Sequence, residues 1–214
     1  PGLGPARLWH AARRPSWVVT CTEDCAADAL RGARARSKGI TVGRAGVLRS
    51  FEAQPVKDAM RWTIEEVARA LGVAAPPGLD PLARLAGVSI DSRTLRPGEL
   101  FFAIHGPRHD GHSFVAAALA AGAPAAVVAR ARVAEFSAEL RGKLLAVDDT
   151  QQALQQLALA VRRAWGGCLA GVTGSVGKTT TKEILAALLA ARFRVLKSEG
   201  NLNNEYGLPL TLLR

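Results

Sequence analysis

The residues best suited to chemistry lie at positions 173–180, which read Thr-Gly-Ser-Val-Gly-Lys-Thr-Thr. Small residues let backbone N–H groups approach the oxygens of a phosphate closely, and a helix that follows adds a favourable dipole. Lys178 is expected to contact the β- and γ-phosphates of a nucleotide, and the Thr179 hydroxyl to bind Mg²⁺. The expected phosphate-binding residues are Thr173, Gly174, Ser175, Val176, Gly177, Lys178, Thr179 and Thr180.

This loop departs from the usual phosphate-loop pattern at one position. The pattern G-x-x-x-x-G-K-[ST] requires glycine at position 172, where the sequence has valine, and Gly171 lies one residue too early. The order of elements still fits, because a buried strand is expected to lead into the loop and a helix to follow at 182–191. A phosphate loop by itself does not distinguish hydrolysis that drives motion, phosphoryl donation and activation of a carboxylate.

The elements upstream of the loop predict an α/β layer architecture. Thr63 and Glu66 have capping-box spacing, and apolar residues from Ile64 to Leu71 fall on one face of a helix. Strands and helices then alternate, which is typical of α/β domains. Strands are expected at 87–93, 99–104, 125–129 and 144–147, and helices at 114–121 and 151–165.

Polar residues at the ends of two of these strands are candidates for binding. Ser92 and Arg93 end the first predicted strand, and Arg93 suits a charged oxygen or a planar base edge. His105, His109 and His112 share the polar loop after the second strand. Their spacing lacks carboxylates or cysteines in the order of a metal site, so we interpret His112 as a loop or substrate-site residue.

The charge of the chain is uneven. Its 214 residues carry a net charge of +10, and residues 1–59 alone hold 10 Lys and Arg against 5 Asp and Glu. Apolar residues show little periodic spacing in these 59 residues, whereas a helical spacing of apolar residues begins directly after Met60, the only methionine. We expect 1–59 to be a basic extension and not a folded domain, with domains at 60–165 and 166–214. Met60 is the expected natural start, and an extension present in the cell is the alternative.

Bulk properties exclude other classes. No apolar run approaches the roughly 18 residues of a membrane-spanning helix, and the first residues lack the layout of a signal peptide. We therefore expect a cytoplasmic protein without membrane insertion. The basic extension has no interleaved aromatic residues, so no nucleic-acid partner is expected.

Residues 173–180 resemble the phosphate loop of the Mur ligases, which also lack the usual first glycine. The resemblance extends to 91–93, 97–101 and 110–114, which look like the uridine-nucleotide domain of the later-acting members. Residues 200–213, Gly-Asn-Leu-Asn-Asn-Glu-Tyr-Gly-Leu-Pro-Leu-Thr-Leu-Leu, are similar to the members that add D-alanyl-D-alanine. The resemblance covers 60–214, about the first half of such a ligase.

The resemblance implies a small α/β uridine-nucleotide-binding domain followed by the start of a P-loop, parallel-sheet ATPase domain. It implies an ATP- and Mg²⁺-dependent ligase that joins D-alanyl-D-alanine to UDP-N-acetylmuramoyl tripeptide through an acyl phosphate, in peptidoglycan synthesis. Lys178 and Thr179 would be catalytic, and Ser92, Arg93 and His112 would bind the UDP substrate. Asn204, placed after a second strand of the ATPase domain, would position the nucleotide. The enzyme is expected to be a monomer, and the 214-residue chain to be inactive alone.

Three alternatives stay open. The first is a Mur ligase that adds the third residue of the peptide. The second is a nucleotide-binding module without ligase chemistry, and the third is a nucleic-acid-binding protein that uses the basic extension.

Overall fold

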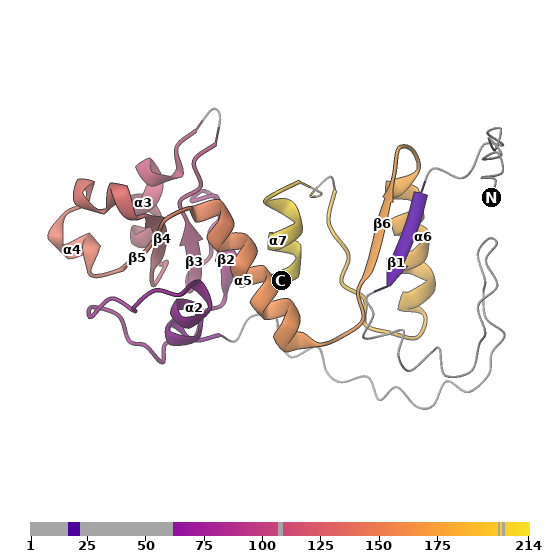
Figure 1. The fold of residues 1–214 in the computed structure, drawn as a ribbon, viewed down its shortest axis with the longest axis horizontal. Helices are drawn as coiled ribbons and strands as arrows, with labels where there is room; N and C mark the ends of the chain where they lie inside the picture. Colours follow the sequence, from indigo (N-terminus) through magenta and orange to yellow (C-terminus); the bar gives the residue numbers. More distant parts are fainter. Residues whose placement is uncertain (1–16, 22–61, 107–108, 201, 203) are drawn as a thin grey trace, which may run out of the picture. The chain divides into compact units, whose positions relative to one another are not determined.

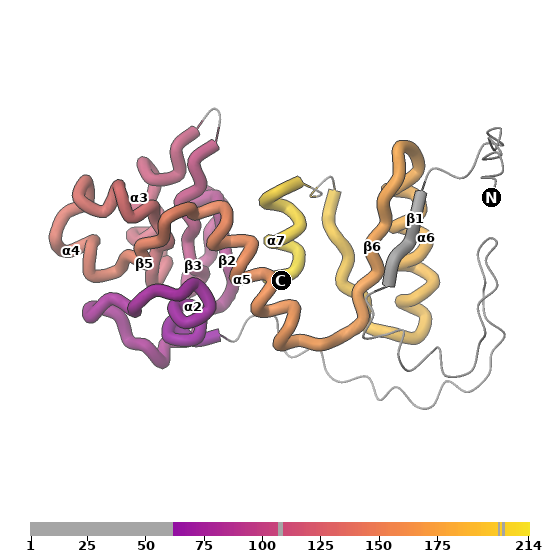
Figure 2. The backbone as a smooth tube through the Cα atoms, in the orientation of Figure 1, coloured from indigo at the N-terminus to yellow at the C-terminus, as the bar shows by residue number. Residues whose placement is uncertain are grey.

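The computed structural model describes residues 17–21, 62–106, 109–200, 202 and 204–214 (Figure 1). Figure 2 traces the backbone as a tube in the same orientation. These residues fall into two compact units. One unit contains residues 17–21 and 168–195, and the other contains the rest of the described chain. Residues 196–214 thus group with the upstream residues, whereas the sequence places them after a boundary at 165. The proposed domain boundaries stay a prediction.

The larger unit is built on a parallel sheet with the strand order β2-β3-β4-β5. Its strands are β2 (Gly87–Ser89), β3 (Glu99–Phe102), β4 (Ala126–Ala129) and β5 (Leu144–Val147). The four strands lie where the sequence predicts them, and β2 ends earlier than expected, at Ser89. The predicted α/β architecture with a parallel sheet is confirmed.

Helices cover both faces of this sheet. On β3, Leu100 and Phe102 are buried in one apolar cluster, while Phe101 and Ala103 are buried in the other. This alternation follows from the two-residue period of a strand. The first cluster includes residues of α2 (Ile64–Leu71) and α5 (Thr150–Trp165), and the second includes residues of α3 (Val115–Ala120). The result is a three-layer unit. Shorter elements are η1 (Gly111–Phe114), η2 (Arg130–Glu135) and α4 (Ala138–Arg141).

The predicted capping box at the start of α2 is confirmed. The Thr63 hydroxyl accepts from the Glu66 backbone N–H at 3.2 Å, and the Thr63 backbone N–H donates to the Glu66 carboxylate at 2.8 Å. Gly72 ends the helix with φ 67°, a left-handed conformation that glycine adopts without strain. Both ends of α2 are therefore defined by local chemistry.

An additional helix, α7 (Gly207–Leu212), packs against α5 in the same unit (Figure 1). The Tyr206 hydroxyl donates to the Gln151 side-chain oxygen at 3.1 Å, and the Gln151 side-chain N–H donates to the Glu205 carboxylate at 3.1 Å. The sequence did not predict this helix. Pro209 is tolerated because it lies in the first turn, where its missing N–H has no intrahelical partner.

The smaller unit contains the phosphate loop. It comprises β6 (Ala170–Gly174), α6 (Lys178–Ala190) and β1 (Trp17–Cys21), which pairs antiparallel with β6 from Trp17↔Gly174 to Cys21↔Ala170. One expectation is wrong, because helix α6 begins at Lys178 instead of 182. Among the described residues, β6 pairs with β1 alone.

The expected second strand of the ATPase domain is also absent from the described residues. Residues 194–199 show no regular secondary structure. Whether residues 1–59 fold as a domain stays a prediction, since only 17–21 of them are described. Among the helices of the described residues, none combines the length and apolar character needed to cross a membrane.

Candidate nucleotide and substrate sites

The phosphate loop joins the end of β6 to the start of α6. Gly177 is the N-cap of α6 and has φ 81° and ψ 2°, so it lies in the left-handed region that glycine adopts without strain. No side chain caps this end of the 13-residue helix. The first backbone N–H groups of a helix have no intrahelical partners, and they form the positive end of its dipole. The start of α6 is therefore suited to an anion.

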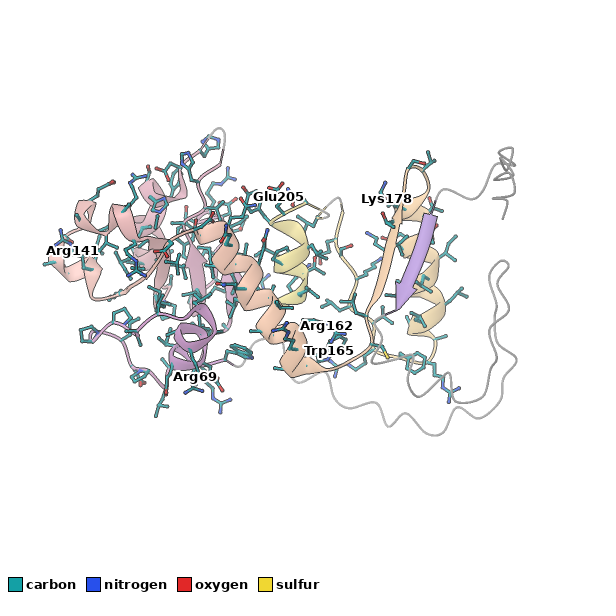
Figure 3. The ribbon with its side chains drawn as sticks, in the orientation of Figure 1. Arg69, Arg141, Arg162, Trp165, Lys178 and Glu205 are labelled. Carbon is teal, nitrogen blue, oxygen red and sulfur yellow. The ribbon has the colours of Figure 1, made fainter. Side chains whose placement is uncertain are left out.

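Lys178 lies at this loop, at the first position of α6 (Figure 3). Its ammonium group donates to the backbone carbonyl of Gly174 at 2.5 Å, which places the positive charge over the loop. Thr179 and Thr180 follow in the first turn and are exposed. A threonine hydroxyl is a hard oxygen ligand of the kind that Mg²⁺ prefers, so Thr179 fits the predicted role. The ion would supply positive charge beside the phosphates.

The predicted UDP-binding residues lie in the larger unit, at one edge of its sheet. Because the strands are parallel, the residues that follow them gather at their carboxyl ends, where open α/β sheets bind ligands. Ser92 and Arg93 follow β2, His112 follows β3, and Arg130 follows β4. The structure thus brings the candidates from separate loops to the same edge.

Asp91 holds Arg93 in a defined position. The Arg93 guanidinium donates to both carboxylate oxygens of Asp91, at 2.9 and 2.6 Å, and the Arg93 backbone N–H donates to the same carboxylate at 3.0 Å. The Arg93 side chain is 86% exposed, so it stays accessible to a ligand. Ser92 is half-buried beside it. The side-chain hydrogen bond from Arg93, with its backbone N–H, lowers the pKa of Asp91 to about 2.

Replacing Arg93 by glutamine is expected to raise the pKa of the Asp91 carboxyl from about 2 towards its ordinary value of 3.8. The charge-assisted bonds favour the ionised carboxylate, so removing the guanidinium favours the proton. Any stabilisation by this pair is present above the ordinary pKa and is lost as the pH falls through about 2. A ¹³C NMR titration of the carboxyl carbon measures both values. Equal pKa values in the two proteins would contradict the observed geometry.

His112 is buried, with 4% of its surface exposed. Its Nδ1 lies 2.7 Å from the Asp110 carboxylate, and its Nε2 accepts from the backbone N–H of Ala129 at 3.0 Å. Asp110 also accepts from Arg132 at 2.7 Å. Both ring nitrogens therefore already have protein partners, and the predicted contact of His112 with substrate stays a prediction. The roles of Asp110 and Arg132 were not predicted from the sequence.

Asn204 belongs to the larger unit, and the phosphate loop belongs to the smaller one. Its side-chain oxygen accepts from the backbone N–H of Gly207 at 2.8 Å, at the start of α7. The observed role of Asn204 is therefore to fix the start of this helix. Its predicted contact with the nucleotide stays a prediction.

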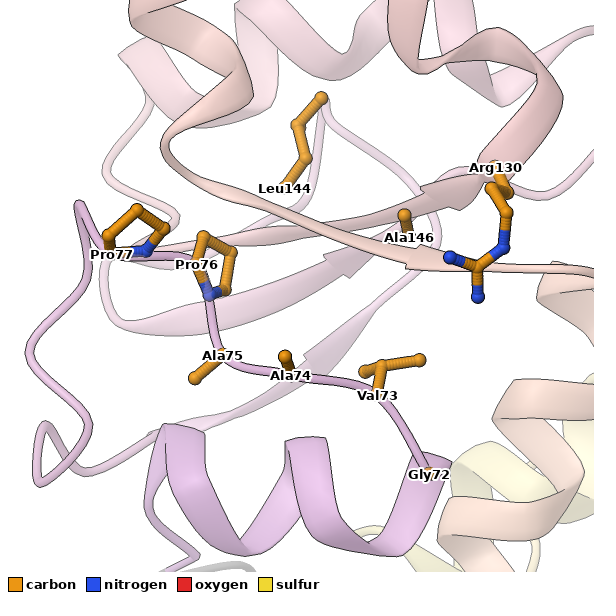
Figure 4. Close-up of a pocket in the computed structure, with 9 residues that line it drawn as sticks. All are labelled: Gly72, Val73, Ala74, Ala75, Pro76, Pro77, Arg130, Leu144 and Ala146. Atoms are coloured by element: carbon orange, nitrogen blue, oxygen red, sulfur yellow. The ribbon is translucent and has the colours of Figure 1, made fainter.

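A surface pocket of about 350 Å³ lies between residues 72–77 and the edge strand β5 (Figure 4). Leu144 and Ala146 of β5 line one side, and Arg130 lies at one end. None of the predicted site residues lines it. Most of the residues that line it have small, apolar side chains.

Two family models match the chain on either side of the predicted domain boundary. Residues 84–162 match "Mur ligase family, catalytic domain", and residues 172–214 match "Mur ligase middle domain". The chain therefore belongs to the Mur ligase family.

Several relatives share one name, UDP-N-acetylmuramoyl-tripeptide--D-alanyl-D-alanine ligase. The protein of that name from Bacillus subtilis is 43% identical over 155 residues, which are 72% of this chain and 33% of the relative. Its counterpart from Synechocystis is 45% identical over 130 residues, 61% of this chain and 28% of the relative. A crystal structure of MurF from Acinetobacter baumannii matches with a TM-score of 0.58 and 32% identity, over 73% of this chain and 33% of that one.

The chain thus spans about a third of the length of these relatives. This corrects the expectation that it spans about half of such a ligase.

Proposed function

We propose that this chain contributes the phosphate-binding and UDP-substrate-binding parts of an ATP-dependent ligase. The ligase joins D-alanyl-D-alanine to UDP-N-acetylmuramoyl tripeptide in peptidoglycan synthesis. The observation that carries the proposal is the loop in which Gly177 opens α6 and Lys178 lies over the carbonyl of Gly174. The shared name of the relatives supports the choice of substrates.

The chemistry explains why such a ligase needs a phosphate loop. A carboxylate is a poor acyl donor, so the tripeptide carboxylate first takes the γ-phosphoryl group of ATP, which forms an acyl phosphate and ADP. The amine of D-alanyl-D-alanine then attacks the acyl carbon, and inorganic phosphate leaves as the amide bond forms. Lys178, with Mg²⁺ bound by Thr179, would stabilise negative charge on the transferring group.

The C-terminal edge of the parallel sheet is proposed to bind the UDP portion of the substrate. Arg93 is exposed there and is held by Asp91, so its remaining donors are directed before a ligand arrives. Ser92 adds a hydroxyl beside it. We further propose that the ligase is a cytoplasmic monomer.

The test is phosphate release by the full-length gene product with UDP-N-acetylmuramoyl tripeptide, ATP, Mg²⁺ and D-alanyl-D-alanine. The proposal expects release that requires both the tripeptide and the dipeptide. A parallel assay offers UDP-N-acetylmuramoyl dipeptide with diaminopimelate or lysine. Release only in that assay would assign the ligase that adds the third residue, and release in neither would leave a nucleotide-binding module.

A further inference from the structure

Four charged and polar side chains form a cluster at the C-terminal edge of the sheet. They come from the start of η1 and from η2, and they are Asp110, His112, Arg132 and Glu135. Asp110 lies at the centre. One of its oxygens accepts from the backbone N–H and from the ring of His112, at 3.0 and 2.7 Å, and the other accepts from Arg132 at 2.7 Å.

The imidazole of His112 connects this cluster to the sheet. The backbone N–H of Ala129 donates to Nε2 at 3.0 Å, so that nitrogen carries no proton. The single proton of the neutral ring is then on Nδ1, which donates to Asp110 at 2.7 Å. Ala129 is the last residue of β4. The ring therefore ties the segment after β3 to the end of the neighbouring strand.

The backbone around the cluster is also tightly packed. Gly111 N–H donates to the Ile104 carbonyl at 2.9 Å, and a Cβ at position 111 would lie 2.7 Å from both the N and the O of Ile104. No side chain fits there without moving backbone. Arg132 also donates to Glu135, which fixes the guanidinium from its other side. Both carboxylate oxygens of Asp110 therefore have defined partners.

We infer that Asp110, through His112 and Arg132, is a positioning residue of the uridine-nucleotide site. It sets the distance between the segment after β3 and the end of β4, at the sheet edge where Ser92 and Arg93 follow β2. A ligand held by several loops binds tightly only if those loops are already in place. This inference rests on the proposed function, because it takes that edge as the UDP site.

The test measures UDP binding by the 214-residue chain with isothermal titration calorimetry, and the fold of each variant with a urea unfolding curve. Asp110→Asn removes the charge that holds Arg132 and keeps a side chain of the same shape. We expect it to raise the Kd for UDP about tenfold or more, because charge-assisted bonds are the strong ones. His112→Gln keeps an acceptor for Ala129 and loses the donor to Asp110, so its Kd should lie between those of the wild type and His112→Leu.

A matched control removes a surface ion pair from the same unit. Glu65→Gln breaks the pair with Arg69 on α2, whose side chains are 51% and 72% exposed, and it should leave the Kd unchanged. ¹⁵N NMR of the imidazole adds a signature that general destabilisation does not move. His112 should show a protonated Nδ1 and an unprotonated Nε2.

The outcomes separate the two proposals. If the wild type binds UDP and folded Asp110→Asn binds it equally well, the positioning role is wrong and the proposed site stands. If Asp110→Asn does not fold, the comparison of His112→Gln with His112→Leu decides, and equal Kd values overturn the role. A proton on Nε2 of His112 in the wild type also overturns it. If the wild type does not bind UDP, the proposed UDP site itself fails.

Discussion

Replacing Lys178 by alanine is expected to lower phosphate release by the full-length ligase about a hundredfold to a thousandfold. The ammonium group lies over the loop carbonyl of Gly174, at the positive end of α6. There it would stabilise the negative charge on the transferring γ-phosphoryl group. Removing it leaves the backbone N–H groups in place, so nucleotide binding should weaken less than turnover. Steady-state phosphate release with both substrates at saturation measures turnover, and titration with a non-hydrolysable ATP analogue measures binding.

Lys182 provides the control for this change. It lies one turn further along α6 and pairs with Glu183 at 3.4 Å. Lys182→Ala removes the same functional group from the same helix and should keep near-normal turnover. Comparable losses in the two variants would show that the ammonium group of Lys178 has no special role, and would contradict the assignment of the loop.

Truncating Phe102 to alanine is expected to lower the free energy of unfolding of the larger unit by about 3–5 kcal/mol. Phe102 has no exposed surface, and it lies in the apolar cluster formed by β3, α2 and α5. The loss combines the removed apolar surface with the cavity left behind, because neighbouring helices relax only partly. The total free energy of unfolding of a domain of this size is about 5–15 kcal/mol, so the variant should be close to unfolding at room temperature. Urea unfolding followed by circular dichroism measures the change.

Leu82→Ala is the matched control on the surface of the same unit. Its side chain is 70% exposed, so the free energy of unfolding should change by less than about 0.5 kcal/mol. A loss below about 1 kcal/mol for Phe102→Ala would mean that the space between β3 and the two helices is loosely packed.

Local patterns in the sequence predicted most of the larger unit. The Thr63–Glu66 spacing, identified from the sequence, fixes the start of α2. In the structure, Asp149 and Gly166 cap the two ends of α5. Each of these signals acts within a few residues of the element that it defines. The strands were found because their apolar runs are bounded by turns. Their order in the sheet was not predicted and is seen in the structure.

The misplaced elements have identifiable causes. Three successive threonines after Lys178 have low helix propensity, so the sequence placed the start of α6 too late. The dipole and the conformation of Gly177 allow the helix to begin there. Glycine and proline within Gly207–Leu212 concealed α7, which is held by contacts with α5 that lie about fifty residues away in the sequence.

The two candidate sites also differ in how far the sequence could predict them. The phosphate loop was predictable because its residues are consecutive and act through the backbone that they share. The role of Asp110 was not predictable, because its partner Arg132 lies 22 residues away in the sequence. His112 likewise bonds to Ala129, which lies 17 residues away. Only the three-dimensional structure shows that these groups meet.

The spatial order of the sheet, β2-β3-β4-β5, is also the order of synthesis. As the chain leaves the ribosome, each strand finds its only earlier neighbour already made, and none has to be inserted between two existing strands. The sheet can therefore grow at one edge, from β2 outward, with each loop closed before the next begins. Helix α5 emerges after β5, so it can cover an exposed apolar face as soon as the last strand is in place.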